Sequence, residues 1–204
     1  QLALCLEKRE MAENIDQFYL ELVQSIADVM DSRDASTEGR TRRSRSLARG
    51  IAQELSLPEN VIYYLEFAAL LHDIGKLAID ESVLKKSGQL TPEEFEVVKT
   101  HSEIGHKILK RISLLVPVAP MVLYHQEWFN GSGYPEGLKG EEIPLGARIV
   151  AVLDAWSAMT SRRPWRSALD PKLASEEIRK GSGSQFDPRV VDAFFAVLEK
   201  QGVA

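Results

Sequence analysis

Apolar residues recur every three or four positions through much of the chain, the spacing that gives an α-helix one hydrophobic face. Near the start these residues are Met11, Ile15, Phe18, Leu22 and Ile26. They predict an amphipathic helix over about residues 7 to 31, which we treat as a linker helix (1–31) before a domain at 32–204. Its apolar face could pack on the domain or pair with another chain, such as a second copy in a homodimer.

Capping residues mark where the next helices begin and end. A second helix is expected over about residues 37 to 55, and a third from an N-cap at Asn60 to a left-handed C-cap glycine at Gly75. Residues 91–94, Thr-Pro-Glu-Glu, combine an N-cap hydroxyl, a proline at the first helical position and a glutamate placed for a capping box. They predict a fourth helix, which carries His101 on its inward face.

The second half of the chain has the same helical character. A short apolar helix is predicted over residues 114–125, followed by a loop rich in glycine and proline at 130–137. Residues 147–158 are apolar on nearly every side, which is typical of a fully buried helix. Two more helices are predicted, at about 172–180 and after Asp187. Because no alternating pattern indicates a strand, we expect an all-α fold, a helical bundle.

Composition and charge exclude several classes of protein. With 44% hydrophobic and 27% charged residues, the chain has the composition of a globular protein with a real core. The net charge of −5 argues against a large surface for nucleic acid polymers or anionic membranes. The lone Cys5 and the absence of a membrane-length apolar run favour a cytoplasmic location. Because the chain starts at Gln1, we expect it to be part of a longer protein with an upstream sensory or receiver domain.

Histidines and aspartates in apolar surroundings are the candidate functional residues. His72 and Asp73 follow two leucines, and Asp154 interrupts the most apolar predicted helix. An ionised aspartate there is costly unless it is paired, hydrogen-bonded or bound to a cation. His101 could meet these groups, whereas His106, five residues or about 500° further along the helix, could not.

A set of imidazoles and carboxylates without thiolates suits a hydrolytic Mn, Fe or Zn ion. Taken singly, each of these residues is more often structural, as a core histidine or a hydrogen-bonded aspartate. The arginines between residues 40 and 49 would likewise usually form a solvated helix face. It is the combination that favours a metal site.

Several motifs, in this order, resemble the HD-GYP domain over about residues 30 to 200. They are His72-Asp73-Ile-Gly-Lys76, His101, His125-Gln-Glu-Trp-Phe-Asn-Gly-Ser-Gly-Tyr-Pro135, Ile149-Val-Ala-Val-Leu-Asp154, Thr160-Ser-Arg-Arg-Pro-Trp-Arg166 and Gly183-Ser-Gln-Phe-Asp-Pro188. The resemblance implies the helical bundle of the HD superfamily of metal-dependent phosphohydrolases. It also implies bacterial signal transduction, with hydrolysis of cyclic di-GMP to pGpG or GMP by one or two divalent ions (Fe, Mn, Zn or Ni).

The same resemblance implies roles for individual residues. The metal ligands would be His72, Asp73, His101, His125 and Asp154, with Asp73 bridging two ions and serving catalysis. Lys76, also catalytic, would face the scissile phosphate or the hydroxide. Substrate would be bound by Lys76, Tyr134, Arg163 and Arg166. The Gly-Tyr-Pro loop would also contact diguanylate cyclase domains.

Two positions depart from the family pattern. Arg40 stands where the family usually has a histidine or a nearby glutamate, and a guanidinium cannot ligate a metal. Gln126 replaces the second of two paired histidines and is a weaker candidate ligand than imidazole. The ligands that remain make one group of His72, Asp73 and Asp154 and another of Asp73, His101 and His125.

These departures leave three interpretations open. The first is a cyclic di-GMP phosphodiesterase whose activity is reduced. The second is a catalytically silent module that binds a cyclic dinucleotide or a partner protein. The third is hydrolysis of another phosphoester, such as a mixed cyclic dinucleotide, at the same metal site.

Overall fold

The structure, a computed structural model, describes residues 11, 14–15, 17–28, 40–86, 88–161 and 167–202. Within these ranges it contains no strand, and an isolated bridge joins Ser182 to Phe186. The predicted all-α bundle is therefore confirmed. None of the described helices is long and apolar enough to cross a membrane.

The elements are α2 (Arg40–Glu54), α3 (Glu59–Leu71), η1 (Ile74–Ala78), α4 (Glu81–Leu84), α5 (Pro92–Lys99), α6 (His101–Leu109), η2 (Ser113–Leu115), α7 (Ala119–Leu123), η3 (Gly140–Glu142), α8 (Leu145–Thr160), α9 (Pro171–Gly181) and α10 (Pro188–Lys200).

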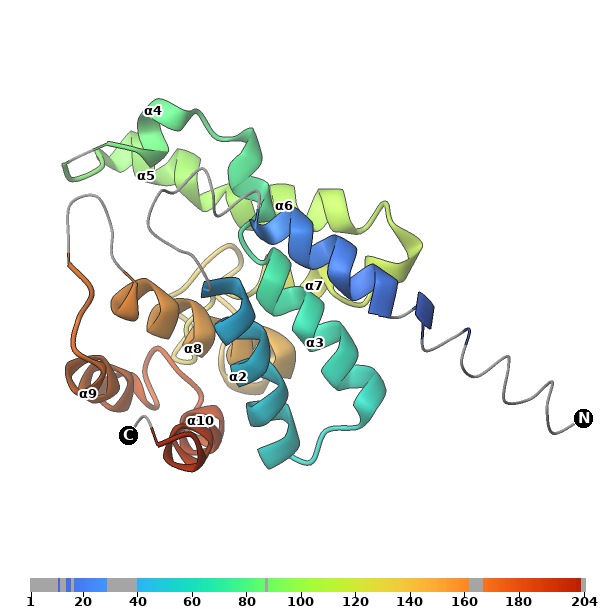
Figure 1. Cartoon of the computed structure of the whole chain (residues 1–204). Coiled ribbons are helices and arrows are strands. Elements are labelled where there is room, and N and C mark those ends of the chain that lie inside the picture. Colours follow the sequence, from blue (N-terminus) through green and yellow to red (C-terminus); the bar gives the residue numbers. More distant parts are fainter. Residues whose placement is uncertain are drawn as a thin grey trace, which may run out of the picture.

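Helix α8 is the centre of the bundle. It packs against α2, α3, α7, α9 and α10 (Figure 1). Ala147, Ile149, Val150, Val152 and Leu153 are buried along it, as its continuous apolar sequence predicted. A helix enclosed on several sides holds its side chains firmly, so Asp154 is carried by the best-supported element of the fold.

A buried ion-pair cluster joins α2 to α3. The Glu66 carboxylate is only 2% exposed and accepts hydrogen bonds from Arg45 at 3.1 Å and from Arg49 at 3.0 and 3.1 Å. Glu66 raises the pKa of the Arg49 guanidinium by hydrogen bonding, which more than offsets the effect of burial. A solvated helix face therefore describes Arg45 and Arg49 only in part: both side chains are partly exposed, and both also pair with a buried carboxylate that needs their charge.

The predicted capping box at the start of α5 is confirmed. The Thr91 hydroxyl accepts from the Glu94 amide, and the Glu94 carboxylate accepts from the Thr91 amide. The single helix expected after it is instead two, α5 and α6. Both the amide and the hydroxyl of Thr100 donate to the Val97 carbonyl, which ends α5 just before His101.

The boundaries predicted for α3 are wrong at both ends. The helix begins at Glu59, because the Pro58 carbonyl already accepts the first helical hydrogen bonds, so Asn60 lies inside the first turn and is not the N-cap. At the other end, the chain passes from Leu71 through His72 into η1 without a left-handed glycine. Gly75 lies in η1, where an added Cβ would be 1.9 Å from the His101 carbonyl oxygen. Its role is therefore to permit close packing of η1 on α6.

The first helix packs on the bundle through a face other than the apolar row noted in the sequence, for which packing on the domain and pairing with another chain were both left open. In its described part, residues 17–28 are helical, and Leu20, Val23 and Ala27 belong to the hydrophobic core. The predicted apolar row, from Met11 to Ile26, is exposed. The periodicity correctly indicated a helix, but the helix is apolar on two sides and only one of them packs on the bundle.

We expect Gly75→Ala to destabilise the fold by about 2 kcal/mol or more, because the methyl group would overlap the His101 backbone and push η1 away from α6. Urea unfolding measures this change. The matched control is Gly88→Ala, since an added Cβ at Gly88 meets nothing within 4 Å. Equal midpoints for the two variants would contradict the proposed close packing.

Candidate metal centre

Five predicted ligands come together from four different parts of the fold, since His72 and Asp73 are neighbours between α3 and η1. His72 directly follows α3, Asp73 precedes η1, His101 opens α6, His125 lies just after α7, and Asp154 is on α8. The packing of α6 on η1 and of α7 on α6 and α8 brings these points together. Residues far apart in sequence thus share one buried region, as the sequence predicted.

The three histidines of this cluster are oriented in the same way. In each, Nδ1 contacts the backbone carbonyl three residues earlier, at 3.0 Å for His72, 2.8 Å for His101 and 2.7 Å for His125. A carbonyl oxygen can only accept a hydrogen bond, so Nδ1 carries the proton and a neutral ring has its lone pair on Nε2. This carbonyl bond is the usual support of a metal-binding histidine.

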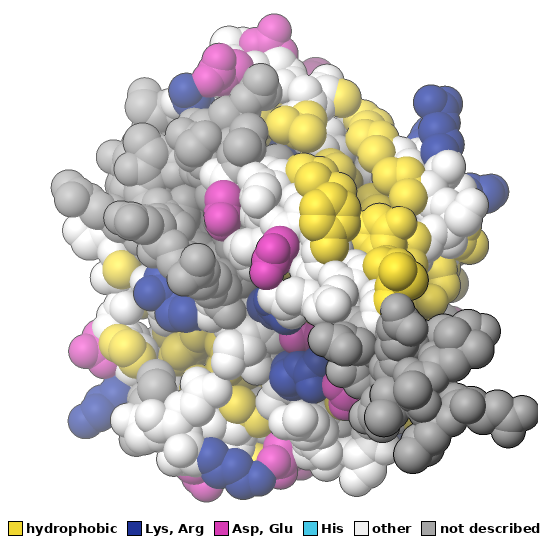
Figure 2. Space-filling view, turned by 45° about the vertical axis from the view of Figure 1, so that its right-hand side comes forward, with side chains coloured by type: hydrophobic (Ala, Val, Ile, Leu, Met, Phe, Trp, Pro, Cys, Tyr) yellow, Lys and Arg dark blue, Asp and Glu magenta, His cyan; other side chains and the backbone are white. Residues whose placement is uncertain are grey.

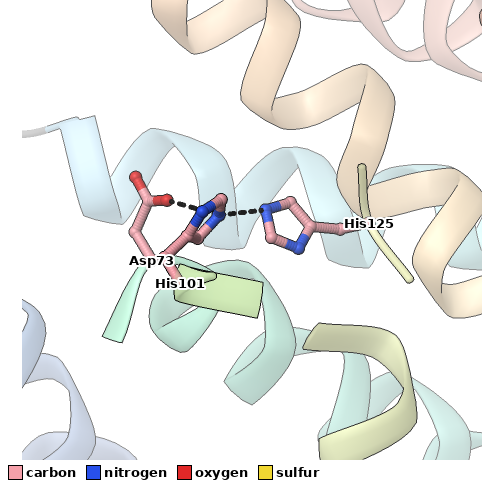
Figure 3. A group of neighbouring side chains, drawn as sticks. All are labelled: Asp73, His101 and His125. Carbon is pink, nitrogen blue, oxygen red and sulfur yellow. Dashed lines mark hydrogen bonds and ion pairs between the residues drawn. The ribbon is translucent and has the colours of Figure 1, made fainter. Parts of the chain in front are cut away.

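The Nε2 atoms of His101 and His125 face each other at 3.3 Å, as Figure 3 shows. Nε2 of His101 also lies 3.6 Å from Oδ1 of Asp73. That oxygen is buried and has no hydrogen-bond partner among the described residues. Three lone pairs therefore converge with no proton to share between neutral rings. A cation bound between them would relieve the repulsion.

The ligand atoms form two groups that share Asp73. One contains Asp73, His101 and His125, the other His72, Asp73 and Asp154, and within each group the ligand atoms lie within 4.8 Å of one another. These are the two groups expected from the sequence. The nitrogen and carboxylate donors fit a divalent transition metal. His106 is in neither group, as its position on the helix predicted.

The electrostatics of the cluster keep both aspartates ionised. Burial alone would raise the pKa of Asp73, but the charges of Lys76 and His72 hold it well below its usual range. For Asp154 the hydrogen bond and charge of His72 likewise outweigh burial and lower the pKa. Burial also opposes protonation of His72, yet the charge of Asp73 and the hydrogen bond to Asp154 raise its pKa.

His101 and His125 are held neutral. Burial is the main cause in both: it lowers the pKa of His101, and together with repulsion from His72 and His101 it lowers the pKa of His125 to about 3. A neutral imidazole is the form that binds a metal. Beside the ionised carboxylates, His101 and His125 thus present unprotonated Nε2 atoms, whereas the two aspartates favour the protonated form of His72.

Two polar side chains contact the carboxylates directly. The Lys76 ammonium lies 2.6 Å from Oδ2 of Asp73, so it is placed inside the site, as expected. The Gln126 side chain donates from Nε2 to Oδ2 of Asp154 at 2.9 Å. In this arrangement the amide nitrogen, which cannot ligate a metal, is the end of Gln126 that meets the carboxylate.

The glycine-rich loop is anchored by a residue to which the sequence analysis assigned no role. Glu127 is 2% exposed, and its Oε1 accepts from the backbone amides of Glu136 at 2.7 Å and Gly137 at 2.9 Å. These bonds tie residues 136 and 137 of the loop to Glu127. In the same loop, burial and the charges of Asp154 and Asp73 raise the pKa of Tyr134. A glutamate three residues before a glycine-rich segment was the available signal.

Three of the predicted positions lie outside what the structure describes. Arg163 and Arg166 fall in the range 162–166, and the side chain of Arg40 is likewise outside the described residues. Their roles remain predictions.

Known proteins are similar to this chain in sequence and in fold. The HD domain family matches residues 24–190, which is most of the chain. The chain belongs to the HD domain family. The cyclic di-GMP phosphodiesterase of Thermotoga maritima is 42% identical over 200 residues, which cover 96% of this chain and 54% of that protein. The cyclic di-GMP phosphodiesterase response regulator RpfG of Xanthomonas campestris pv. campestris is 40% identical, with 95% of this chain and 52% of that protein covered.

This chain thus spans about half the length of the curated relatives that it matches. Among solved structures, a cyclic GMP-AMP specific phosphodiesterase of Vibrio cholerae, V-cGAP3, superposes with a TM-score of 0.69 at 22% identity. The match covers 90% of this chain and 49% of that chain, and it supports the fold. Together with the motif ending in Gly133-Tyr134-Pro135, these matches confirm the predicted HD-GYP resemblance.

We expect Glu127→Ala to release the loop, since two backbone amides would lose a charged acceptor, at a cost of about 2 kcal/mol. Hydrogen exchange at the amides of Glu136 and Gly137 should become faster. Glu141→Ala, which removes a largely exposed carboxylate nearby, serves as control and should leave this exchange unchanged. Unaltered protection in Glu127→Ala would show that other contacts hold the loop.

Proposed function

We propose that this chain is a metal-dependent phosphodiesterase domain that hydrolyses cyclic di-GMP to pGpG and GMP. The observation that carries the proposal is the convergence of the His101 and His125 Nε2 atoms on the unpartnered Oδ1 of Asp73. A purely structural cluster would supply a donor for these lone pairs. The substrate is proposed from the similarity to the cyclic di-GMP phosphodiesterases of Thermotoga maritima and Xanthomonas campestris.

The chain's own residues would divide the work of binding and catalysis. His101 and His125 would hold one divalent ion (Fe, Mn, Zn or Ni), His72 and Asp154 would hold the other, and Asp73 would contribute to both. A bound ion of this kind lowers the pKa of water and offsets charge on phosphate oxygens.

Lys76 would add a fixed positive charge beside Asp73, where a scissile phosphate gains negative charge. Arg163, Arg166 and Tyr134 would bind the dinucleotide. Charged hydrogen bonds from arginine fit a phosphate group well. This would allow a chain of net charge −5 to bind an anion locally. The Gly-Tyr-Pro loop would also be available to diguanylate cyclase domains.

Metal content tests the proposal first. Protein purified without oxygen should contain about one or two equivalents of transition metal per chain, measured by elemental analysis, and should linearise cyclic di-GMP. Asp73→Asn should lose metal from both groups and abolish turnover, because Asp73 is shared. His106→Gln, outside both groups, should retain both properties. A chain without metal, or an active and metal-loaded Asp73→Asn variant, would refute the assignment.

Lys76→Met should retain the metal but reduce kcat by about a hundredfold, because a fixed charge beside the reacting phosphate is lost. Lys86→Met is the matched control: the two lysine side chains are both 35% exposed, but Lys86 pairs with Glu94 away from the cluster. Steady-state kinetics with elemental analysis check both variants. Equal kcat values for Lys76→Met and the unmodified chain would rule out the assigned role.

A second candidate function is binding without turnover. The hydrogen bond from Gln126 to Oδ2 of Asp154 favours it, because an amide donor stands where the family pattern has an imidazole that could offer a lone pair. A silent module should purify without stoichiometric metal and still bind cyclic di-GMP. A mixed cyclic dinucleotide, the substrate type named for the Vibrio structure, would be distinguished by comparing kcat/KM for the two dinucleotides.

A further inference from the structure

The first helix has two apolar faces. Leu20, Val23 and Ala27 form one face, which is buried in the core of the domain. The other face is a row of exposed residues: Met11, Ile15, Phe18, Leu22 and Ile26. Met11 is 65% exposed and Phe18 is 61% exposed. Helices that are apolar on both sides are normally covered on both sides.

This exposed row is continuous and not a scatter of single residues. Tyr19 extends it sideways, and its ring meets that of Phe18 edge-on, with centroids 6.1 Å apart. Figure 2 shows hydrophobic side chains gathered into a band on one face of the molecule. Scattered apolar residues are common on protein surfaces, but a contiguous patch of this kind marks an interaction site.

The spacing within the row indicates another helix as the occupant. Steps of four, three and four residues lead from Met11 through Ile15 and Phe18 to Leu22. These are the alternating steps between the a and d positions of paired helices, so these four residues form the seam of the proposed pair. The core-facing residues Leu20 and Ala27 fall at the positions opposite the seam, so a second helix can approach without meeting the domain.

Charges beside the seam distinguish the possible orientations. One flank carries Asn14, Glu21 and Asp28, seven residues apart, and the other flank carries the uncharged Tyr19 and Ile26. In a parallel pair of identical helices each flank faces the opposite flank of the partner, so the Glu21 carboxylate lies beside an uncharged residue. In an antiparallel pair each flank faces the same flank of the partner helix. The flank with Glu21 and Asp28 would then face the Glu21 and Asp28 flank of the second copy. Because like charges placed side by side are unfavourable, the parallel arrangement is preferred.

We propose that two copies of this chain dimerise through a parallel pairing of their first helices along Met11, Ile15, Phe18 and Leu22. The six exposed apolar side chains of each copy amount to an interface on the order of 1,000 Å², the lower end of what a specific dimer buries. This places the two domains on the outer sides of the helix pair. The proposal does not depend on hydrolysis at the metal centre.

Oligomeric mass tests the pairing. In analytical ultracentrifugation the unmodified chain should have twice the molar mass of one chain. The Phe18→Glu variant should have the mass of a monomer, because a charge would enter the seam in both copies. The matched control is Gln17→Glu, which adds the same charge in the same turn but away from the seam, at an exposed position. This control should remain a dimer. A monomeric unmodified chain, or a dimeric Phe18→Glu variant, would overturn the proposal.

Disulfide trapping tests the orientation, in a Cys5→Ser background that removes the native thiol. In a parallel pair residue 11 meets its own counterpart, so Met11→Cys should form an intermolecular disulfide, whereas Gln17→Cys, off the seam, should not. An antiparallel pair centred on the same row would instead join Met11→Cys to Leu22→Cys in a mixture of the two variants. That result, or a dimer in which Met11→Cys fails to cross-link, would overturn the parallel arrangement.

Discussion

The approach of two unprotonated imidazole nitrogens, His101 Nε2 and His125 Nε2, is the interaction on which the site depends. Each ring is fixed from behind by a bond to a backbone carbonyl, so neither can turn a proton toward the other without losing that bond. Burial keeps both rings neutral. The resulting concentration of lone pairs, with Asp73 beside it, is unfavourable in the protein alone and well suited to a cation.

The rest of the domain can be understood as the support for this arrangement. Gly75 lets η1 pack on the start of α6, which sets Asp73 beside His101. Helix α8, enclosed by its neighbours, supplies Asp154 from the other side. The buried Glu66 cluster joins α2 to α3, and α3 ends directly at His72. The ligands thus lie at element ends or on the central helix, where their backbones are well restrained.

Membership of the HD domain family agrees with this cluster of donors, and the structure describes one of the two departures from the family pattern, Gln126. Gln126 remains in the site but binds Asp154 through its amide nitrogen, so it helps to orient a carboxylate. A histidine there would offer a lone pair instead. Because Asp73 belongs to both candidate ligand groups, loss of one outer ligand still leaves a set of donors around it.

The sequence by itself determined the all-α class, most of the helices and the residue types of the metal cluster. These features are local: apolar spacing, capping residues and short motifs each act within a few positions of the chain. Apolar surroundings singled out His72, Asp73 and Asp154 in the sequence, and the resemblance to the HD-GYP domain assigned ligand roles to these three and to His101 and His125.

Only the tertiary structure decided which surfaces meet. The sequence showed an apolar row in the first helix, but the domain buries Leu20 and Val23 on another face. It showed a run of arginines, but not that Arg45 and Arg49 pair with Glu66. It showed Gln126, but not which end of the amide faces Asp154. Such choices depend on contacts between segments distant in the chain, where burial and charge pairing outweigh local periodicity.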